Sequence, residues 1–383
     1  PPDAELTVLA GALQLAPPAA PRGQRLPIDA LFRSLAAAQG RRAVGIVLSG
    51  MGSDGTRGLQ AIKQQGGLTA VQQPETAQFD AMPRHAIATG CVDTIAAPAD
   101  LPARVLAAMA VPAPAGGGTQ PALDTILALL HAHTRHDLAL YKSSTLVRRI
   151  ARRMAVHGLA AMADYADLLR THPQELDLLF KELLIGVTAF FRDPPVWQVL
   201  QDKVLPRLAA LQADDHRPAR AWVAGCSTGE EAYALAIAHL ELRDALPATA
   251  RRDLQIFATD LNPDAVAVAR AGRYPATIAQ DLTPERLARF FTACPGGYQV
   301  DKRLRDMVLF AQHDVATDPP FTRLDLISCR NLLIYFGAAL QRRLIPLFHY
   351  SLRPGGVLLL GGSETIGRAQ ALFQPLDPKA RLY

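Results

Sequence analysis

The segment from Arg220 to Asp260 constrains this chain more than any other part of it. Residues 220–231 read Arg-Ala-Trp-Val-Ala-Gly-Cys-Ser-Thr-Gly-Glu-Glu, and residues 255–260 read Gln-Ile-Phe-Ala-Thr-Asp. This order predicts a short buried strand, a turn of small residues that opens a helix, and a second strand that ends in a carboxylate. Such a turn lets a ligand approach the backbone at a helix N-terminus, and the acid can hold ribose hydroxyls. We therefore expect a nucleotide-type binding site at the ends of these strands.

The glycines of this turn narrow the choice of ligand. Gly225 and Gly229 do not complete the G-x-G-x-x-G pattern, so a dinucleotide with its pyrophosphate fits poorly. A cofactor that has a ribose and no phosphate fits better, and S-adenosylmethionine is the obvious candidate.

Length and composition set wider limits. The chain has 383 residues, of which 49% are apolar, enough for two or three domains with real cores. It contains no run of about 18 uninterrupted apolar residues, so membrane insertion is not expected. The four cysteines, Cys91, Cys226, Cys294 and Cys329, are far apart and form no C-x-x-C motif, so we expect neither a metal site nor a disulfide framework, and a reducing cytoplasm as the location. The chain begins at Pro1 rather than Met, which suggests a longer protein whose other domains are partners.

The pattern of elements divides the chain into domains. Residues 111–120 are rich in Pro, Gly and Ala and predict a linker. Residues 1–110 alternate strand and helix signals, as in an α/β domain, and residues 121–195 predict a small all-α domain. Residues 196–383 predict a doubly wound, Rossmann-like parallel sheet with an insertion at 283–307. The strands expected in that sheet are residues 221–224, 255–259, 308–312, 325–329 and 357–360.

Four motifs in the second half of the chain occur in an order that indicates a protein family. They are Thr-Ala-Phe-Phe-Arg at 188–192, Gly-Cys-Ser-Thr-Gly-Glu-Glu at 225–231, Ala-Thr-Asp at 258–260 and Ser-Cys-Arg-Asn-Leu-Leu-Ile-Tyr-Phe at 328–336. From about Gln120 to Tyr383 the chain resembles the chemotaxis receptor methyltransferases (CheR type), which are protein-glutamate O-methyltransferases. The resemblance implies methyl transfer from S-adenosylmethionine to receptor glutamates, with S-adenosylhomocysteine as product.

The resemblance also implies which residues line the cofactor pocket. They are Thr188, Arg192, Glu231, Asp260, the backbone around Asp314 and Val315, Arg330 and Asn331. Arg192 and Tyr335 are implied at the reacting end, close to the sulfonium and the incoming substrate. The family usually has Asn two residues before the Thr, whereas this chain has Gly186, so one polar contact to the cofactor is missing.

The implied reaction needs few catalytic groups. A glutamate side chain, with an ordinary pKa of about 4.3, is a carboxylate at neutral pH, so its attack on a sulfonium methyl requires no general base. Alignment and exclusion of water then do most of the work. Arg192 can orient a carboxylate through charge-assisted hydrogen bonds, and Tyr335 can close the site or donate to an oxygen.

Single residues of this set have simpler interpretations. Arg192 alone could cap the preceding helix and pair with Asp193, and Asp260 could be a helix N-cap. Two other functions also remain open. Gly186 favours a non-catalytic cofactor-binding or signal-binding module. The Asp-Pro-Pro-Phe sequence at 318–321 resembles a motif of nucleic-acid methyltransferases, but it precedes the strand at 325–329 that it should follow, and we interpret it as a turn.

A second constellation lies between Tyr141 and Met154. On a helix, Leu146, Ile150 and Met154 fall on one side, and the opposite side is basic. The arginines of that basic face are Arg148, Arg149, Arg152 and Arg153. The face could simply be solvated, but the resemblance suggests that it docks the acidic helical bundle of a receptor's cytoplasmic region. Nucleic acid is not an expected partner, because no aromatic residues interleave with these charges.

The N-terminal domain has its own signature. Residues 45–58 read Gly-Ile-Val-Leu-Ser-Gly-Met-Gly-Ser-Asp-Gly-Thr-Arg-Gly, which resembles the C-terminal half of the chemotaxis receptor methylesterases (CheB type), a group of Ser-His-Asp hydrolases. Asp54 matches the triad acid, and the nucleophile and histidine belong to upstream segments. We do not expect Ser53 and His85 to replace them, because the sequence around Ser53 lacks the first Gly of a G-x-S-x-G nucleophile motif and His85 lies where the family does not have its triad histidine. We expect this half to be inactive.

Overall fold

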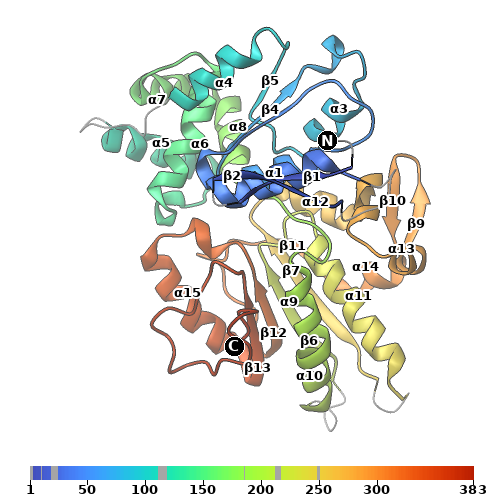
Figure 1. Cartoon of the computed structure of the whole chain (residues 1–383). Coiled ribbons are helices and arrows are strands. Elements are labelled where there is room, and N and C mark those ends of the chain that lie inside the picture. Colours follow the sequence, from blue (N-terminus) through green and yellow to red (C-terminus); the bar gives the residue numbers. More distant parts are fainter. Residues whose placement is uncertain are drawn as a thin grey trace. The chain divides into compact units, whose positions relative to one another are not determined.

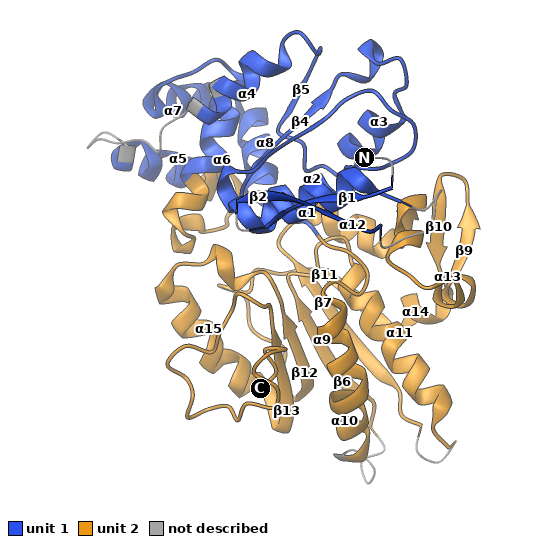
Figure 2. Cartoon of the chain, viewed as in Figure 1, with its two compact units in different colours: residues 1–129, 147–187 blue, residues 130–146, 188–383 orange. Residues whose placement is uncertain are grey.

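The structure is a computed structural model that describes residues 3–9, 11–18, 25–110, 119–184, 186–211, 217–247 and 251–383. The chain forms two compact units, residues 1–129 with 147–187 and residues 130–146 with 188–383 (Figure 2). No helix in the described ranges is long and apolar enough to cross a membrane.

A five-stranded parallel sheet organises the second unit (Figure 1). Its strands are β6 (Ala219–Ala224), β7 (Leu254–Asp260), β11 (Val308–Gln312), β12 (Leu324–Cys329) and β13 (Leu352–Leu360). They lie in the order β11-β7-β6-β12-β13, and every pairing is parallel. The chain runs outward from β6 to β11 and then returns to the other side of β6. The predicted doubly wound sheet is therefore confirmed, with its switch point between β6 and β12.

Helices cover both faces of this sheet because its strands are apolar on both sides. Along β6, Ala221 and Val223 belong to one buried cluster, and Trp222 and Ala224 belong to the other. The first cluster includes the apolar residues of α11 (Glu230–Ala245), and the second includes those of α15 (Ala338–Ser351). The other helices of this unit are α9 (Pro194–Val199), α10 (Leu205–Leu211), α12 (Pro263–Ala271), α13 (Pro284–Phe290) and α14 (Lys302–Met307).

The predicted insertion is present but begins earlier than expected. A small antiparallel sheet contains β8 (Arg273–Pro275), β9 (Phe291–Cys294) and β10 (Gly297–Val300) in the order β8-β10-β9. It therefore starts at residue 273 rather than 283, because β8 pairs with β10. Arg273-Tyr-Pro is too short a segment to give a strand pattern of its own.

The first unit combines α/β and helical parts. Parallel strands β3 (Val44–Val47), β4 (Leu68–Gln72) and β5 (Thr94–Ala96) form one sheet, and β1 (Glu5–Leu9) and β2 (Ala12–Ala16) form an antiparallel pair. The helices of the α/β part are α1 (Pro27–Gln39), α2 (Thr56–Gln64), α3 (Ala81–Ala88) and α4 (Leu101–Ala110). Those that follow are α5 (Thr119–Thr134), α6 (Ser143–Val156), α7 (Met162–Thr171) and α8 (Pro173–Leu183).

The compact units do not follow the predicted domain limits. Residues 111–118 of the predicted linker lie outside the described residues, and Thr119 and Gln120 already belong to α5. Residues 130–146 group with the large sheet, since Tyr141 bridges to Phe336 and Lys142 donates its backbone N–H to the carbonyl of Tyr335.

Candidate functional site at the carboxyl ends of β6, β7 and β12

The turn after β6 is tight and built for close approach. The N–H groups of Gly225 and Cys226 both donate to the carbonyl of Thr259, at 2.8 and 2.9 Å. Gly225 and Gly229 have φ values of +75° and +97°. A Cβ on Gly229 would lie 2.8 Å from the Cβ of Ala269, so only glycine fits there. The turn thus presents bare backbone directly before the N-terminus of α11, as the sequence predicts.

Asp260 ends β7 beside this turn. Its Oδ2 accepts a hydrogen bond from the Ser227 N–H at 2.8 Å, and its Oδ1 accepts one from the Asn262 N–H at 2.9 Å. Burial raises the pKa of the Asp260 carboxyl. The N-cap of α12 is Asn262, whose side chain accepts from Asp264 N–H. The alternative interpretation of Asp260 as a helix cap was therefore wrong, and its carboxylate retains lone pairs for a ligand.

Arg330 follows β12 and ties three segments together. Its side chain is 1% exposed and pairs with Asp193 at 2.8 Å and with Glu231 at 3.1 Å. It also donates to the carbonyl of Arg192 at 2.9 Å, and the Ser328 hydroxyl donates to Glu231 at 2.7 Å. The end of β12, the start of α11 and the segment before α9 are thus held together by charge-assisted bonds.

Arg192 lies half-buried in this network. Burial lowers the pKa of its guanidinium, Asp193 opposes that shift, and the positive charge of Arg330 adds to it. Glu231 and Tyr335 also interact with Arg192 electrostatically. The two residues predicted at the reacting end therefore lie within electrostatic range of each other. Asp193 forms an ion pair with Arg330.

The remaining predicted residues surround this network less directly. Thr188 is half-buried in the segment between α8 and α9. Asp314 is buried after β11, where its carboxylate accepts from the Ala316 N–H at 2.9 Å and lies 3.3 Å from His136 Nδ1. Val315 packs in the core cluster.

Two acidic residues near this site were missed by the sequence reasoning. The Thr228 hydroxyl donates to both carboxyl oxygens of Glu230, at 2.9 and 2.7 Å, and burial raises the pKa of Glu230 to about 7. Glu364, after β13, is 4% exposed and accepts backbone N–H groups of the loop that carries Asn331. Glu230 lies inside the Gly-Cys-Ser-Thr-Gly-Glu-Glu motif at 225–231. The only sequence signal for Glu364 is its place after Gly361-Gly362 at the end of the last strand.

Backbone strain is concentrated at this site. Phe191, Asp193, Ser227 and Asn331 have φ values of +49°, +61°, +50° and +59°. Non-glycine residues rarely occupy this left-handed region, and the strain costs of order 1–3 kcal/mol each. The four lie in the segments around Arg192, in the turn after β6 and in the loop after β12.

In the first unit, Asp54 serves as a backbone acceptor. Its Oδ1 accepts from the N–H groups of Asp29 and Gly55, both at 2.9 Å, and its Oδ2 accepts from Ile28 N–H at 3.1 Å. The bonds from Ile28 and Asp29 satisfy the first N–H groups of α1. His85 Nδ1 lies 2.9 Å from the Gly52 carbonyl, and no described histidine is hydrogen-bonded to Asp54.

The basic side of α6 differs from its prediction. Its arginines are Arg148, Arg149, Arg152 and Arg153, and none of the four is exposed. Leu146, Ile150 and Met154 are buried, as predicted. Arg149 is itself buried and donates to the backbone carbonyl of Glu182.

Carboxylates of the same unit occupy two more of these guanidinium groups. Arg152 Nε lies 3.1 Å from Asp93, whose side chain is 3% exposed and also pairs with Lys63. Arg153 donates to Glu175 at 2.8 and 2.6 Å. The expectation of an exposed basic face was therefore wrong, because buried acids use these charges. The docking role itself stays a prediction.

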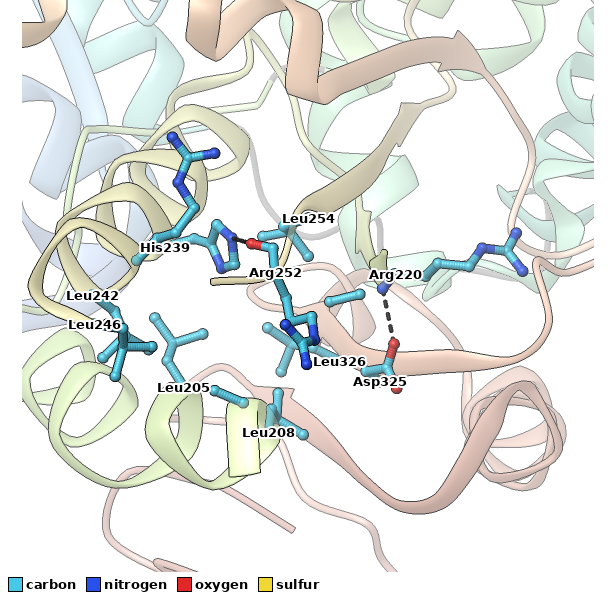
Figure 3. Close-up of a pocket in the computed structure, with 13 residues that line it drawn as sticks. Leu205, Leu208, Arg220, His239, Leu242, Leu246, Arg252, Leu254, Asp325 and Leu326 are labelled. Carbon is cyan, nitrogen blue, oxygen red and sulfur yellow. Dashed lines mark hydrogen bonds between the residues drawn. The ribbon is translucent and has the colours of Figure 1, made fainter. Parts of the chain in front are cut away.

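A hollow elsewhere on the sheet contains none of the predicted cofactor residues (Figure 3). It has a volume of about 30 Å³ and lies at the amino ends of β6, β7 and β12. Its lining includes Leu205, Leu208, Leu242 and Leu254. Ligands of doubly wound sheets bind at the opposite, carboxyl ends of the strands, so this hollow is not the cofactor site.

The residues at the carboxyl ends fit S-adenosylmethionine. The turn after β6 offers bare backbone, and Asp260 offers carboxylate oxygens to ribose hydroxyls. The Nε of Arg330 is buried and has no hydrogen-bond partner among the described residues, so a donor remains for a ligand. These groups would hold the cofactor between the loops after β6, β7 and β12.

Three family models match stretches of this chain. Residues 186–381 match the family described as "CheR methyltransferase, SAM binding domain". Residues 121–184 match "CheR methyltransferase, all-alpha domain", and residues 1–105 match "CheB methylesterase".

Individual relatives extend the comparison. The "Uncharacterized 104.1 kDa protein in hypE 3'region" of Rhodobacter capsulatus is 41% identical over 396 residues, which cover 95% of this chain and 41% of that protein. The "Chemotaxis protein methyltransferase" of Listeria innocua is 35% identical over 230 residues, which cover 60% of this chain and 84% of the relative. The CheB methylesterase catalytic domain of Thermotoga maritima aligns with a TM-score of 0.25 and 23% identity, covering 27% of this chain and 55% of that chain.

The chain thus spans less than half the length of the Rhodobacter capsulatus relative and most of the length of the Listeria innocua relative. Its cofactor-binding match alone extends over more than half of its residues. The chain therefore belongs to the CheR family of S-adenosylmethionine-dependent chemotaxis protein methyltransferases, and it carries a CheB methylesterase domain ahead of the methyltransferase.

Proposed function

We propose that this protein methylates glutamate side chains in the cytoplasmic helical region of chemotaxis receptors and forms glutamyl methyl esters. The observation that supports the proposal is the electrostatic interaction of Arg192 with Tyr335 and with the Arg330–Glu231 ion pair, at the edge of the sheet where β7 ends in Asp260. This grouping has charged donors for an acceptor carboxylate. A cytoplasmic location belongs to the same proposal.

The reaction divides its tasks between the cofactor and the chain. Bound S-adenosylmethionine supplies an electrophilic methyl group on sulfur. Arg192 orients the acceptor carboxylate, which is ionised at neutral pH and needs no base. Arg330 holds Glu231 and Asp193 so that Arg192 keeps its position, and Tyr335 excludes water from the acceptor side.

A direct experiment tests the proposal. The chain is incubated with methyl-labelled S-adenosylmethionine and a glutamate-rich receptor fragment, and the label is then treated with mild base. We expect a base-labile methyl ester. A base-stable product on nucleic acid would favour the nucleic-acid alternative, and binding of cofactor without transfer would favour a non-catalytic module.

Receptor docking by Arg148, Arg149, Arg152 and Arg153 is part of the proposal. Because acids of the first unit already pair with Arg152 and Arg153, docking requires that a receptor carboxylate replaces such a partner. Charge reversal at these positions would also disturb folding, so it cannot test docking by itself.

Asp260→Asn is expected to weaken cofactor binding by about 1–3 kcal/mol, because a buried ribose hydroxyl loses a charged acceptor. Calorimetric titration with S-adenosylhomocysteine measures the change. Asp253→Asn is the matched control, since Asp253 precedes the same strand and its side chain is 84% exposed. Equal affinities of both variants would remove Asp260 from the binding site.

We also propose that the methylesterase domain of this chain is inactive, so the 383-residue chain should not hydrolyse methylated receptor glutamates. Asp54 directs its hydrogen bonds to the N-terminus of α1 rather than to a histidine. A carboxylate without a histidine to orient cannot activate a hydroxyl. Methanol release from a methylated receptor fragment is the assay, and release that disappears in Ser53→Ala would contradict the prediction.

A further inference from the structure

The loop after β12 is held by a buried acid that has no described cationic partner. Glu364 Oε2 accepts from the N–H groups of Asn331 at 2.9 Å and Gly361 at 2.7 Å, and its Oε1 accepts from Ile334 N–H at 3.2 Å. The residue is 4% exposed, and burial raises the pKa of its carboxyl against the opposing effect of these backbone donors. Desolvating a carboxylate costs several kcal/mol unless such bonds offset the loss.

These bonds fix the part of the loop that carries two predicted site residues. Asn331 is held at a φ of +59°, and Tyr335 follows directly after the Ile334 N–H that Glu364 accepts. Leu332 packs against the cofactor turn, where a Cβ on Gly225 would lie 3.1 Å from its Cδ2. A shift of this loop would therefore move the tyrosine and also press on the turn after β6.

The contacts around Gly361 show how little space the arrangement allows. A Cβ on Gly361 would lie 2.7 Å from Glu364 Oε2 and 2.8 Å from the backbone nitrogen of Asn331. Gly362, the next residue, has nothing within 4 Å of such a Cβ. A methyl group on buried Gly361 would thus separate Glu364 from the loop, whereas one on exposed Gly362 would not.

We propose that Glu364 is a positioning residue for methyl transfer: its carboxylate holds the loop from Asn331 to Tyr335 in the reactive conformation. It touches neither the methyl group nor the acceptor and acts through Tyr335 and Asn331. Its two carboxyl oxygens hold the two ends of this loop: Oε2 accepts from the Asn331 N–H and Oε1 accepts from the Ile334 N–H.

Two substitutions test the proposal by different routes. Glu364→Gln keeps the shape but loses a carboxylate oxygen as acceptor, and Gly361→Ala leaves the acid in place but displaces Asn331 from it. Each is expected to lower kcat per folded molecule about tenfold or more, since displacements near 1 Å can cost about a hundredfold. Gly361→Ala keeps the proposal testable if Glu364→Gln does not fold.

Matched controls separate positioning from stability. Gly362→Ala adds the same methyl group in open space. Asp325→Asn alters a buried acid that accepts the Arg220 N–H at the opposite end of β12. Both are expected to keep kcat within about twofold of wild type, whatever they do to the melting temperature. If folded Glu364→Gln and Gly361→Ala kept wild-type kcat, Glu364 would be a structural residue only.

A double-variant cycle tests whether Glu364 acts through Tyr335. The fold loss of kcat in the double variant Glu364→Gln with Tyr335→Phe should be smaller than the product of the two single losses. The reason is that removing the hydroxyl of a tyrosine that is already displaced causes a smaller further loss of kcat. Fully multiplicative losses would overturn this route.

The turnover assay rests on the proposed acceptor, and an inactive wild type would count against that acceptor. The loop is then assessed by S-adenosylhomocysteine affinity, which Gly361→Ala but not Gly362→Ala should weaken about fivefold or more; equal affinities would overturn the inference.

Discussion

Replacing Arg153 by alanine is expected to lower the free energy of unfolding by about 3–5 kcal/mol, because it leaves a buried carboxylate without its counter-ion. Glu175 is 5% exposed and accepts two bonds from Arg153, one from the Tyr165 hydroxyl at 2.7 Å, and lies 3.0 Å from His157 Nε2. Removing the guanidinium removes the strongest of these donors. Urea denaturation followed by far-UV circular dichroism measures the change.

The stability difference between wild type and Arg153→Ala should depend on pH in a definite direction. Burial alone would raise the pKa of Glu175, but the hydrogen bonds from Arg153, Tyr165 and His157 outweigh burial and lower it from its ordinary value of 4.5. A carboxyl group whose pKa is lower in the folded state than in the unfolded state stabilises the fold at pH values above its unfolded-state pKa. That stabilisation is lost as the pH falls through its folded-state pKa. The difference between wild type and Arg153→Ala should therefore shrink below pH 4.5.

Arg170→Ala is the control for this experiment. Arg170 forms an ion pair with Asp167 on the surface of the same unit, where their side chains are 52% and 69% exposed. Exposed pairs contribute about 0–1 kcal/mol. If both variants lost the same small amount, the Arg153–Glu175 pair would not be the buried support that the structure indicates.

Arg192→Ala is expected to reduce methyl transfer at saturating cofactor about a hundredfold, the loss typical of removing a preorganised donor. Tyr335→Phe should cost less, because the ring still excludes water. Initial rates of label transfer to a receptor fragment give kcat for both variants. Arg342→Ala removes the same charge from an exposed position on α15 and should leave kcat unchanged.

Kinetic parameters distinguish the two possible roles of Arg192. An interaction made only in the transition state lowers kcat and kcat/KM together, whereas uniform binding raises KM and leaves kcat alone. A variant that lost cofactor affinity but kept its turnover would place Arg192 on the cofactor and away from the acceptor.

The sequence was most informative about the large sheet and its turns. The five predicted strands are all present, because a parallel sheet covered on both faces requires short apolar runs that can be recognised individually. The turn after β6 and the acid at the end of β7 could also be predicted, since both lie at fixed positions next to those strands. The start of the insertion could not, because three residues of β8 depend on pairing with β10.

The charged residues were less predictable. On a helical projection, the arginines of α6 look like a solvated face, but Asp93 lies far from Arg152 in sequence and Glu175 follows Arg153 on another helix. Periodicity within one helix carries no information about such partners. Burial of these charges depends on which acids the packing brings to them.

The same reasoning applies to the candidate site. The sequence alone determined the order of the strands along the chain, the glycine turn, Asp260 and the motif residues Arg192, Arg330 and Tyr335. Only the tertiary structure decided that Arg330 joins Glu231 to Asp193 and that Glu364 holds the loop before Tyr335. The physical reason is that strands and turns form from neighbouring residues, whereas a buried charge is stable only where the fold delivers its hydrogen-bond partners from distant parts of the chain.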